Sequence, residues 1–225
     1  TGEFSGLYSR LRSSGARAAE EKGPGAVDIK GKFSHVKASA VGQYLPNGIA
    51  RTRSYLEHAL QDGEMTSATF QLKGELYEFP FRNGKGGTFT ARAAIKDVDF
   101  RYNDDWPAVN NINGVLSFDN TKFGLAIDAA KILNTNIKRS SIAIADLNDK
   151  TGLIAINLTA DARAEEVAKF LRESPLANTV GGFTKVVAMD GYGKLDLGLA
   201  VPLVAGTGVI KVNGKYALLR ATAKP

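Results

Sequence analysis

Apolar and polar residues alternate along most of this chain, with the period of two that indicates β-strands buried on one face. In residues 88–95, Phe89 and Ile95 share one face with the alanines between them, while polar side chains occupy the other. After Ile95 the phase changes, because Val98 and Phe100 stand at even positions. A slip of one residue is typical of a β-bulge, and we predict one near Lys96–Asp97.

The same alternation predicts strands over much of the remaining sequence. Candidate strands lie at 4–12, 26–38, 66–76, 136–147, 152–160 and 194–203. Two hairpins are predicted. One turns at Asp119–Asn120. The other turns at Asn213–Gly214, because Asn-Gly is a favoured two-residue turn. Residues 12–25 and 103–114 have the composition of loops.

Two segments have the periodicity of short amphipathic helices. The first is predicted from Ile49 to Gln61, after Pro46-Asn47-Gly48 and with Gly63 as its C-cap. The second follows Asp161, which we interpret as an N-cap, and ends at Ser174–Pro175.

This order of elements predicts a mainly β fold with two short α-helices. Strands that follow one another through short turns favour a largely antiparallel, extended and curved sheet over parallel crossovers. We interpret the chain as a single β-rich segment, 1–225, with 1–80 and 81–225 as alternative sub-units. Because it begins at Thr1, we expect it to be cut from a longer protein.

The composition is that of a folded chain with a real core. Of 225 residues, 44% are hydrophobic and 23% are charged. The net charge of +6 includes no run of five or more like charges, so we expect no nucleic-acid partner. The absence of cysteine excludes disulfides and thiolate sites.

Residues suited to chemistry are sparse. His35 and His58 have no metal-ligand partner at strand or helix spacing, and Asp104-Asp105 lacks the surrounding oxygen ligands of a calcium loop. The glycine-rich segment 83–88 leads into a strand, so no helix N-terminus would face a phosphate. We therefore expect no catalytic residue, no metal and no cofactor.

The apolar strand faces leave two interpretations open. One face of an antiparallel sheet normally forms the inside of a core. Two helices of three or four turns, however, look too few to cover about ten strands. A surplus apolar face, if open, would be a binding groove.

Three stretches of the sequence resemble the YhdP-type, AsmA-like family of Gram-negative bacteria, which is grouped with TamB-like proteins. They are "YLPNGIARTRSYLEHALQDGEMTSATFQLKGELYEFPF", "GTFTARAAIKDVDFRYNDDWPAVNNINGVLSFDN" and "ADARAEEVAKFLRESPL" followed by "GYGKLDLGLAVPL". The resemblance covers Tyr44 to Leu203 and matches the central region of those proteins.

The resemblance implies a non-enzymatic role in lipid transport. Such proteins are long, anchored in the inner membrane and span the periplasm, and an open gutter of strands shields phospholipid acyl chains on their way to the outer membrane. This chain would be one segment of that bridge, with acyl chains, neighbouring segments of the same chain and envelope proteins as partners. We expect the anchoring helix to belong to another part of that longer protein.

On this hypothesis ten apolar residues line the groove: Phe70, Leu72, Phe89, Ile95, Phe123, Leu125, Ile127, Leu195, Leu197 and Leu199. Two rival hypotheses stay open. One is a structural or assembly module of the cell envelope with a closed core and a protein partner. The other is an envelope enzyme, which would need paired carboxylates drawn from Asp104, Asp105, Asp190 and Asp196.

Overall fold

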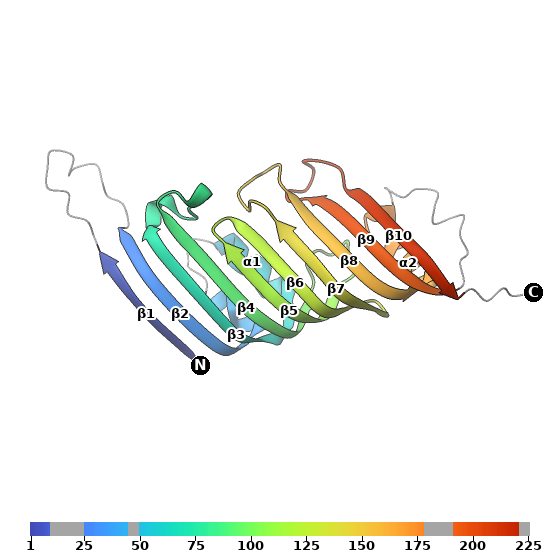
Figure 1. Ribbon diagram of the computed structural model, residues 1–225, viewed down its shortest axis with the longest axis horizontal. Coiled ribbons are helices and arrows are strands. Elements are labelled where there is room, and N and C mark those ends of the chain that lie inside the picture. Colours follow the sequence, from blue (N-terminus) through green and yellow to red (C-terminus); the bar gives the residue numbers. More distant parts are fainter. Residues whose placement is uncertain (10–24, 45–49, 178–190, 221–225) are drawn as a thin grey trace, which may run out of the picture.

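The protein is one open sheet of ten antiparallel strands that follow each other in chain order (Figure 1). The computed structural model describes residues 1–9, 25–44, 50–177 and 191–220. The strands bend along their length, and β1 and β10 lie at opposite ends of the sheet, which does not close. The predicted fold class is confirmed: mainly β, antiparallel and curved, with two short α-helices.

The strands are long, and most are joined by short connections. Their bounds are β1 Gly2–Ser9, β2 Ala26–Lys37, β3 Leu60–Glu75, β4 Gly87–Phe100, β5 Val109–Asp119, β6 Lys122–Ile132, β7 Thr135–Ile144, β8 Leu153–Arg163, β9 Tyr192–Pro202 and β10 Lys211–Arg220. The helices are α1 Ala50–Ala59 and α2 Ala164–Arg172, with 3₁₀ turns η1 Ala38–Tyr44, η3 Leu76–Glu78 and η4 Arg82–Gly84.

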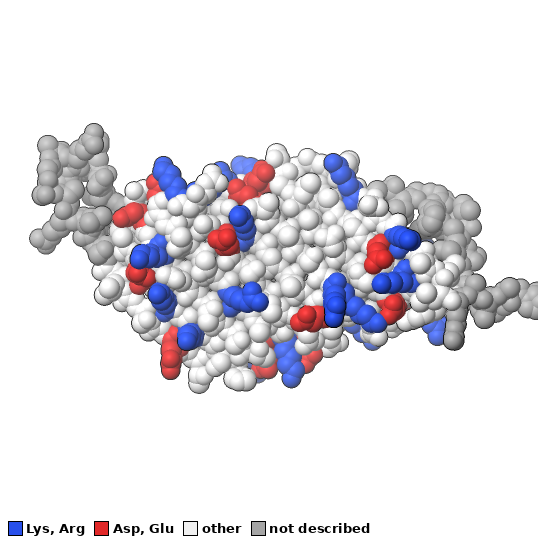
Figure 2. All heavy atoms as spheres, viewed as in Figure 1, with Lys and Arg blue, Asp and Glu red and all other residues white. Residues whose placement is uncertain are grey.

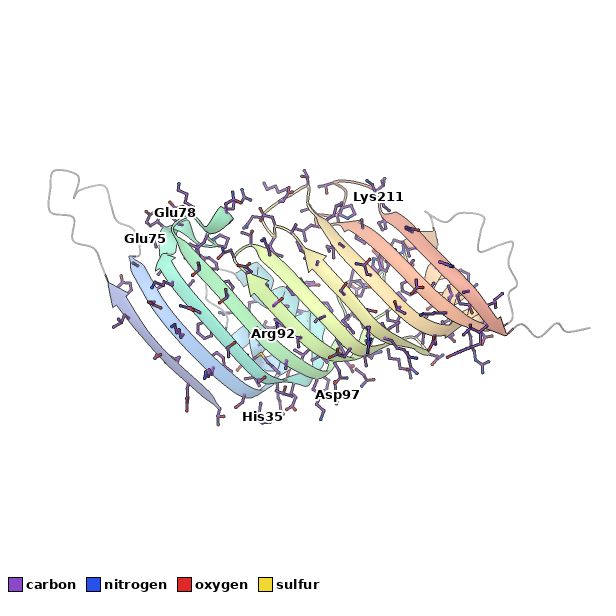
Figure 3. All side chains as sticks on the ribbon, in the orientation of Figure 1. His35, Glu75, Glu78, Arg92, Asp97 and Lys211 are labelled. Carbon is purple, nitrogen blue, oxygen red and sulfur yellow. The ribbon has the colours of Figure 1, made fainter. Side chains whose placement is uncertain are left out.

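The connections between strands alternate between two edges of the sheet, because every neighbouring pair is antiparallel. η1 and α1 join β2 to β3 and α2 joins β8 to β9, so all of these helices leave from one edge, named here the helix edge. The connections 76–86, 120–121, 145–152 and 203–210 form the loop edge. In Figure 3, Glu75 and Glu78 mark the loop edge, and His35 and Asp97 lie toward the helix edge.

The two faces of the sheet differ in chemistry. One face, the apolar face, carries residues such as Phe70 and Leu125 and receives the helices, which lie behind the sheet in Figure 1. The opposite, polar face carries the alternate positions, such as Arg92. Figure 2 views this polar face and shows lysine, arginine, aspartate and glutamate side chains distributed over it.

The helices cover the apolar face in part. Ala38 of η1 packs in a buried cluster with Val98 and Ile127, beneath the helix edge. At the other end of the sheet, Phe170 of α2 and the fully buried Leu176 pack in a second cluster that includes Leu197 and Leu199. Burial of these side chains is what holds the helices against the sheet.

The bulge predicted at Lys96–Asp97 is confirmed. The pairing of β4 with β5 shifts between Ile95 and Val98, and Asp97 takes a left-handed backbone conformation, with φ of 50°. The Asp97 N–H donates to Asn113 Oδ1 at 3.3 Å, and Asn113 Nδ2 donates to Asp97 Oδ1 at 3.2 Å. The bulge returns Val98 to the apolar face.

The hairpin predicted at Asn213–Gly214 is wrong. Both residues lie inside β10, opposite Gly198 and Leu197 of β9, and the chain turns instead at 203–210. Pairing with β9 places Val212 beside Leu199, where it packs against the second buried cluster.

The predicted helix caps are also wrong. β8 continues to Arg163, so Asp161 is a strand residue, and its carboxylate pairs with Lys138 instead of capping α2. β3 already begins at Leu60, so Gly63 lies within a strand. Its φ of +98° and its close approach to Val98 account for the glycine. The opening Pro46-Asn47-Gly48 lies outside the described residues.

We expect replacement of Gly114 by alanine to destabilise the sheet. A Cβ there would lie 2.1 Å from the carbonyl oxygen of Ala126, so the backbone of β5 or β6 must shift. The expected loss in free energy of unfolding is about 1–3 kcal/mol, measured by denaturant titration. Gly198→Ala is the matched control, because its Cβ would be 3.5 Å from the nearest atom; equal losses in both variants would contradict the argument.

Truncation of Leu176 tests whether the segment after α2 is part of the core. Leu176→Ala removes a side chain with 0% exposure, and we expect a loss of about 2–5 kcal/mol in the free energy of unfolding. Leu153→Ala, at a position 43% exposed, should change that free energy by less than about 0.5 kcal/mol. An unaffected Leu176 variant would mean that this segment does not hold the sheet.

Candidate functional site

The candidate site is the apolar face, and its main feature is an unbroken row of apolar residues. In each neighbouring pair of strands, the residues of this central row are direct partners in the antiparallel register. From β1 to β10 the central row is Gly2, Phe33, Ala68, Ala93, Leu116, Leu125, Ile142, Ile156, Leu199 and Val212. It crosses the whole sheet without a polar side chain.

A second row runs parallel to the central row, nearer the loop edge. It passes from Phe4 through Phe70, Ala91, Phe118 and Phe123 and continues to Val201 of β9. At its β2–β3 step the partner of Phe70 is Gly31, and a Cβ on Gly31 would lie 2.1 Å from the Phe70 ring. Gly31 thus leaves the space that this ring occupies.

Aromatic rings follow the loop edge of the apolar face. Phe79 contacts Phe81 and Phe89, with ring centroids 5.7 and 5.6 Å apart. Phe89 continues to Phe118 at 6.3 Å, and Phe118 continues to Phe123 at 5.2 Å. Most of these contacts are tilted or edge-on, the arrangement that aromatic pairs favour. They form a hydrophobic margin along β4, β5 and β6.

A second aromatic chain follows the helix edge. Tyr55 of α1 lies edge-on to Phe100, with centroids 6.4 Å apart, and Phe100 stacks on Tyr102 at 6.1 Å. Tyr102 continues to Trp106 at 6.0 Å, and Trp106 contacts Phe170 of α2 at 6.2 Å. The Tyr55 hydroxyl donates to the Tyr102 carbonyl oxygen at 3.1 Å. These rings link α1, the loop after β4 and α2.

The phenols of this helix-edge chain are held neutral. Burial raises the pKa of Tyr102, and the neighbouring Tyr55 raises it further. Burial also raises the pKa of Tyr55 itself. Both shifts favour the neutral phenol, which is already the form of an ordinary tyrosine at neutral pH.

Ser140, a buried polar side chain close to these rows, is already hydrogen-bonded. Ser140 is buried opposite Ile127, where the pairing of β7 with β8 is irregular. Its hydroxyl donates to the Lys138 carbonyl oxygen at 2.6 Å and accepts from the Thr159 N–H at 3.1 Å. Ser140 thus completes the backbone pairing at a bulge and offers no free group to a ligand.

The ten residues predicted to line a groove all lie on strands of the apolar face, but they differ in burial. Ile127, Leu197 and Leu199 are buried, with 7–8% exposure, and belong to the clusters beneath the helices. The others are partly exposed: Phe70, Leu72, Phe89, Ile95, Phe123, Leu125 and Leu195. The apolar face is therefore neither fully covered nor fully open.

Sequence reasoning missed several residues of this face. Leu116 and Ile142 of the central row alternate clearly but were not singled out. Trp106 and Phe170 gave no usable signal, because Trp106 lies in a loop and its contact with α2 joins residues 64 positions apart in the sequence. Only the folded chain brings those rings together.

The carboxylates considered for an enzyme are not brought together among the described residues. Asp104 and Asp105 lie in the loop after β4, where Asp104 is 3.6 Å from Arg101. Asp196 lies on β9 and accepts from the Thr159 hydroxyl at 3.1 Å. Asp190 lies outside the described residues. Across the described ranges, His, Asp and Glu side chains form no group of three or more that could hold a metal.

The histidines have ordinary surroundings. His35 Nδ1 lies 3.6 Å from Glu64 on the exposed end of β2, and His58 Nδ1 lies 2.7 Å from the Ser54 carbonyl oxygen, one helical turn away.

No helix within the described part of the chain is long and apolar enough to cross a membrane.

Comparison with known proteins bears on this face. The intermembrane phospholipid transporter YhdP of Escherichia coli strain K12 is 26% identical over 149 residues, which are 66% of this chain and 12% of that protein. The chain thus matches a small part of that relative's length. No solved structure matches it. A family model described as "YhdP protein" matches residues 8–222, nearly the whole chain, and the protein therefore belongs to the YhdP family.

Proposed function

We propose that this chain is a segment of a lipid-transfer bridge and that its apolar face shields phospholipid acyl chains. The observation that carries the proposal is the central row, which crosses all ten strands without a polar side chain. The similarity to a phospholipid transporter and the membership in the YhdP family support it. The bridge would stand in the periplasm as part of a protein anchored in the inner membrane.

The length of the central row suits acyl chains. Ten strands are separated by nine spacings of about 4.8 Å, which gives a row of about 43 Å. The hydrocarbon core of a bilayer is about 30 Å thick, so one acyl chain spans about 15 Å. From β1 to β8, before Leu199 is covered beneath α2, the row spans about 34 Å and would offer an apolar path over more than twice that length.

The physical gain is that the acyl chains avoid the free-energy cost of exposure to water. Exposing an acyl chain to water costs about 0.8 kcal/mol per methylene, so a sixteen-carbon tail faces a barrier above ~10 kcal/mol. A surface of aliphatic and aromatic side chains removes most of this cost and makes no directional contact. An acyl chain on it could slide from strand to strand without breaking hydrogen bonds.

The two aromatic chains would act as margins of the path. The loop-edge rings around Phe89 and Phe118 and the helix-edge rings around Phe100 and Trp106 lie on either side of the central row. Partly exposed residues between them, such as Leu125, would contact the lipid. Leu197 and Leu199 would instead support the face from beneath α2.

Further segments of a longer chain would continue the path. In the described sheet, β1 and β10 each pair on one side only. The part of the E. coli transporter that this chain matches is only 12% of that protein, which leaves room for many more strands of the same kind. The polar face would meet the aqueous surroundings and any envelope proteins.

Lipid extraction tests the proposal. Protein made in a Gram-negative host and washed free of detergent should yield stoichiometric phospholipid by mass spectrometry of an organic extract. Leu72→Glu with Phe89→Glu places two charges at a cross-strand pair of the apolar face and should lower the lipid yield about tenfold.

The matched control uses the preceding residue on each strand. Gln71→Glu with Thr88→Glu puts the same charges on the polar face of β3 and β4 and should keep the lipid. Both double variants must unfold cooperatively by circular dichroism for the comparison to count. A clean extract from folded, unmodified protein would instead favour an envelope assembly module with a closed core.

Trp106 offers a second, local test. It is the only tryptophan, it is partly buried, and it lies in the helix-edge aromatic chain. Phospholipid with brominated acyl chains should quench its fluorescence, because bromine quenches on contact, whereas the same headgroup on a short soluble glycerol ester should not. Unchanged fluorescence in a lipid-loaded protein would place the acyl chain away from this edge.

A further inference from the structure

The polar face carries a hollow that the lipid path does not use. Strands β1 to β5 form the floor of an open hollow of about 720 Å³, lined from this side by alternate residues such as Lys30, Lys32, Thr69, Gln71 and Arg92. The size is within the range of ligand sites in proteins. We name it the polar basin and take it as an interaction surface independent of the apolar face.

The basin is basic. Lys30, Lys32 and Arg92 face one carboxylate, that of Glu3, which is the cross-strand neighbour of Lys32 on the edge strand. None of the three cations forms an ion pair within the described part of the chain. Lys73, on the same face, lies 3.4 Å from Asp28. The basin thus carries positive charge without an ion-pair partner, whereas on the neighbouring surface Lys73 is paired with Asp28.

The register fixes the spacing of these charges. Lys32, Thr69 and Arg92 are successive cross-strand partners, so the two cations stand two strands, or about 10 Å, apart. Lys30 lies two residues from Lys32 on the same face, about 7 Å along β2. Thr69 and Gln71 place a hydroxyl and an amide between the cations.

We propose that the polar basin binds an acidic, extended peptide segment of a protein partner. Carboxylates separated along a peptide would reach Lys32 and Arg92, and guanidinium binds carboxylate with two parallel hydrogen bonds. The hydroxyl and amide side chains between them pair with peptide N–H and C=O groups. The occupant lies over the sheet and adds no strand, because β2, β3 and β4 are paired on both sides.

Other occupants fit less well. Sugars and nucleobases stack on aromatic rings, and Phe70 and Phe118, which border the basin, belong to the rows of the apolar face. A bilayer surface is flat at this scale and contacts protruding cations, whereas Arg92 and Lys32 border a hollow. In Figure 3, Arg92 lies on the viewed polar face, well inside the margins of the sheet.

Fluorescence anisotropy of a dye-labelled peptide of five Glu-Gly repeats tests the proposal with the whole chain and no lipid. The double variant Lys32→Gln, Arg92→Gln should weaken binding about tenfold and reduce its dependence on salt. The control is Lys211→Gln, Lys215→Gln, which removes the same charge from the polar face of β10, at the far end of the sheet (Figure 3). It should change the dissociation constant less than about twofold.

Three results would overturn the proposal. The first is no binding by the unaltered protein in 0.15 M salt, with folding confirmed by circular dichroism. The second is equal weakening in the two double variants, which would assign binding to the net charge of +6 rather than to the basin. The third is loss of phosphatidylglycerol vesicle binding in the basin variant with peptide binding intact, which would make the basin a membrane contact.

Discussion

Every property of this protein depends on keeping ten antiparallel strands in phase. Side chains alternate between faces with a period of two, so a slip of one residue would turn a strand's apolar side chains toward water. Backbone pairing alone does not prevent such a slip. Bulges restore the phase: Asp97 and Asn113 hold one in β4, and Ser140 fills another in β7. These irregularities lie on the helix-edge side of the central row, and they return Val98 and Ile137 to the apolar face.

The two faces differ in composition although they share one backbone. The apolar face collects aliphatic and aromatic side chains and receives both helices at one edge, while the polar face carries the charges. Since each strand contributes side chains to both faces, the rows of residues on the two faces have the same strand-to-strand spacing. A substitution such as Gln71→Glu can therefore change one face and leave the row on the other face in place.

Much of the fold was predictable because its signals are local. The alternation, the bulge at Lys96–Asp97 and the existence of both helices follow from neighbouring residues alone, and all three are confirmed. The errors arose where pairing with residues distant in the sequence determines the local structure. Asn213–Gly214 is a favoured local turn, yet β9 holds it within a strand, and residues 109–114, expected to be loop, pair with β4 and β6.

The site was predictable only in its composition. Alternation identified apolar residues such as Leu125, but the burial of Leu197 beneath α2 and the contact of Trp106 with Phe170 depend on how α2 folds back onto the sheet. A sequence pattern states which residues share a face. It does not state which of them another element covers.

The connectivity of the sheet has a consequence for how such a protein grows. Each strand pairs only with the strands before and after it in the sequence, so contacts are local, as in repeat proteins, and stability accumulates from neighbour to neighbour. A duplicated hairpin could be inserted at any turn of the loop edge without breaking any other strand pair. Each insertion would lengthen the central row by about 10 Å. The span of the molecule is thus a quantity that evolution can adjust in steps of two strands.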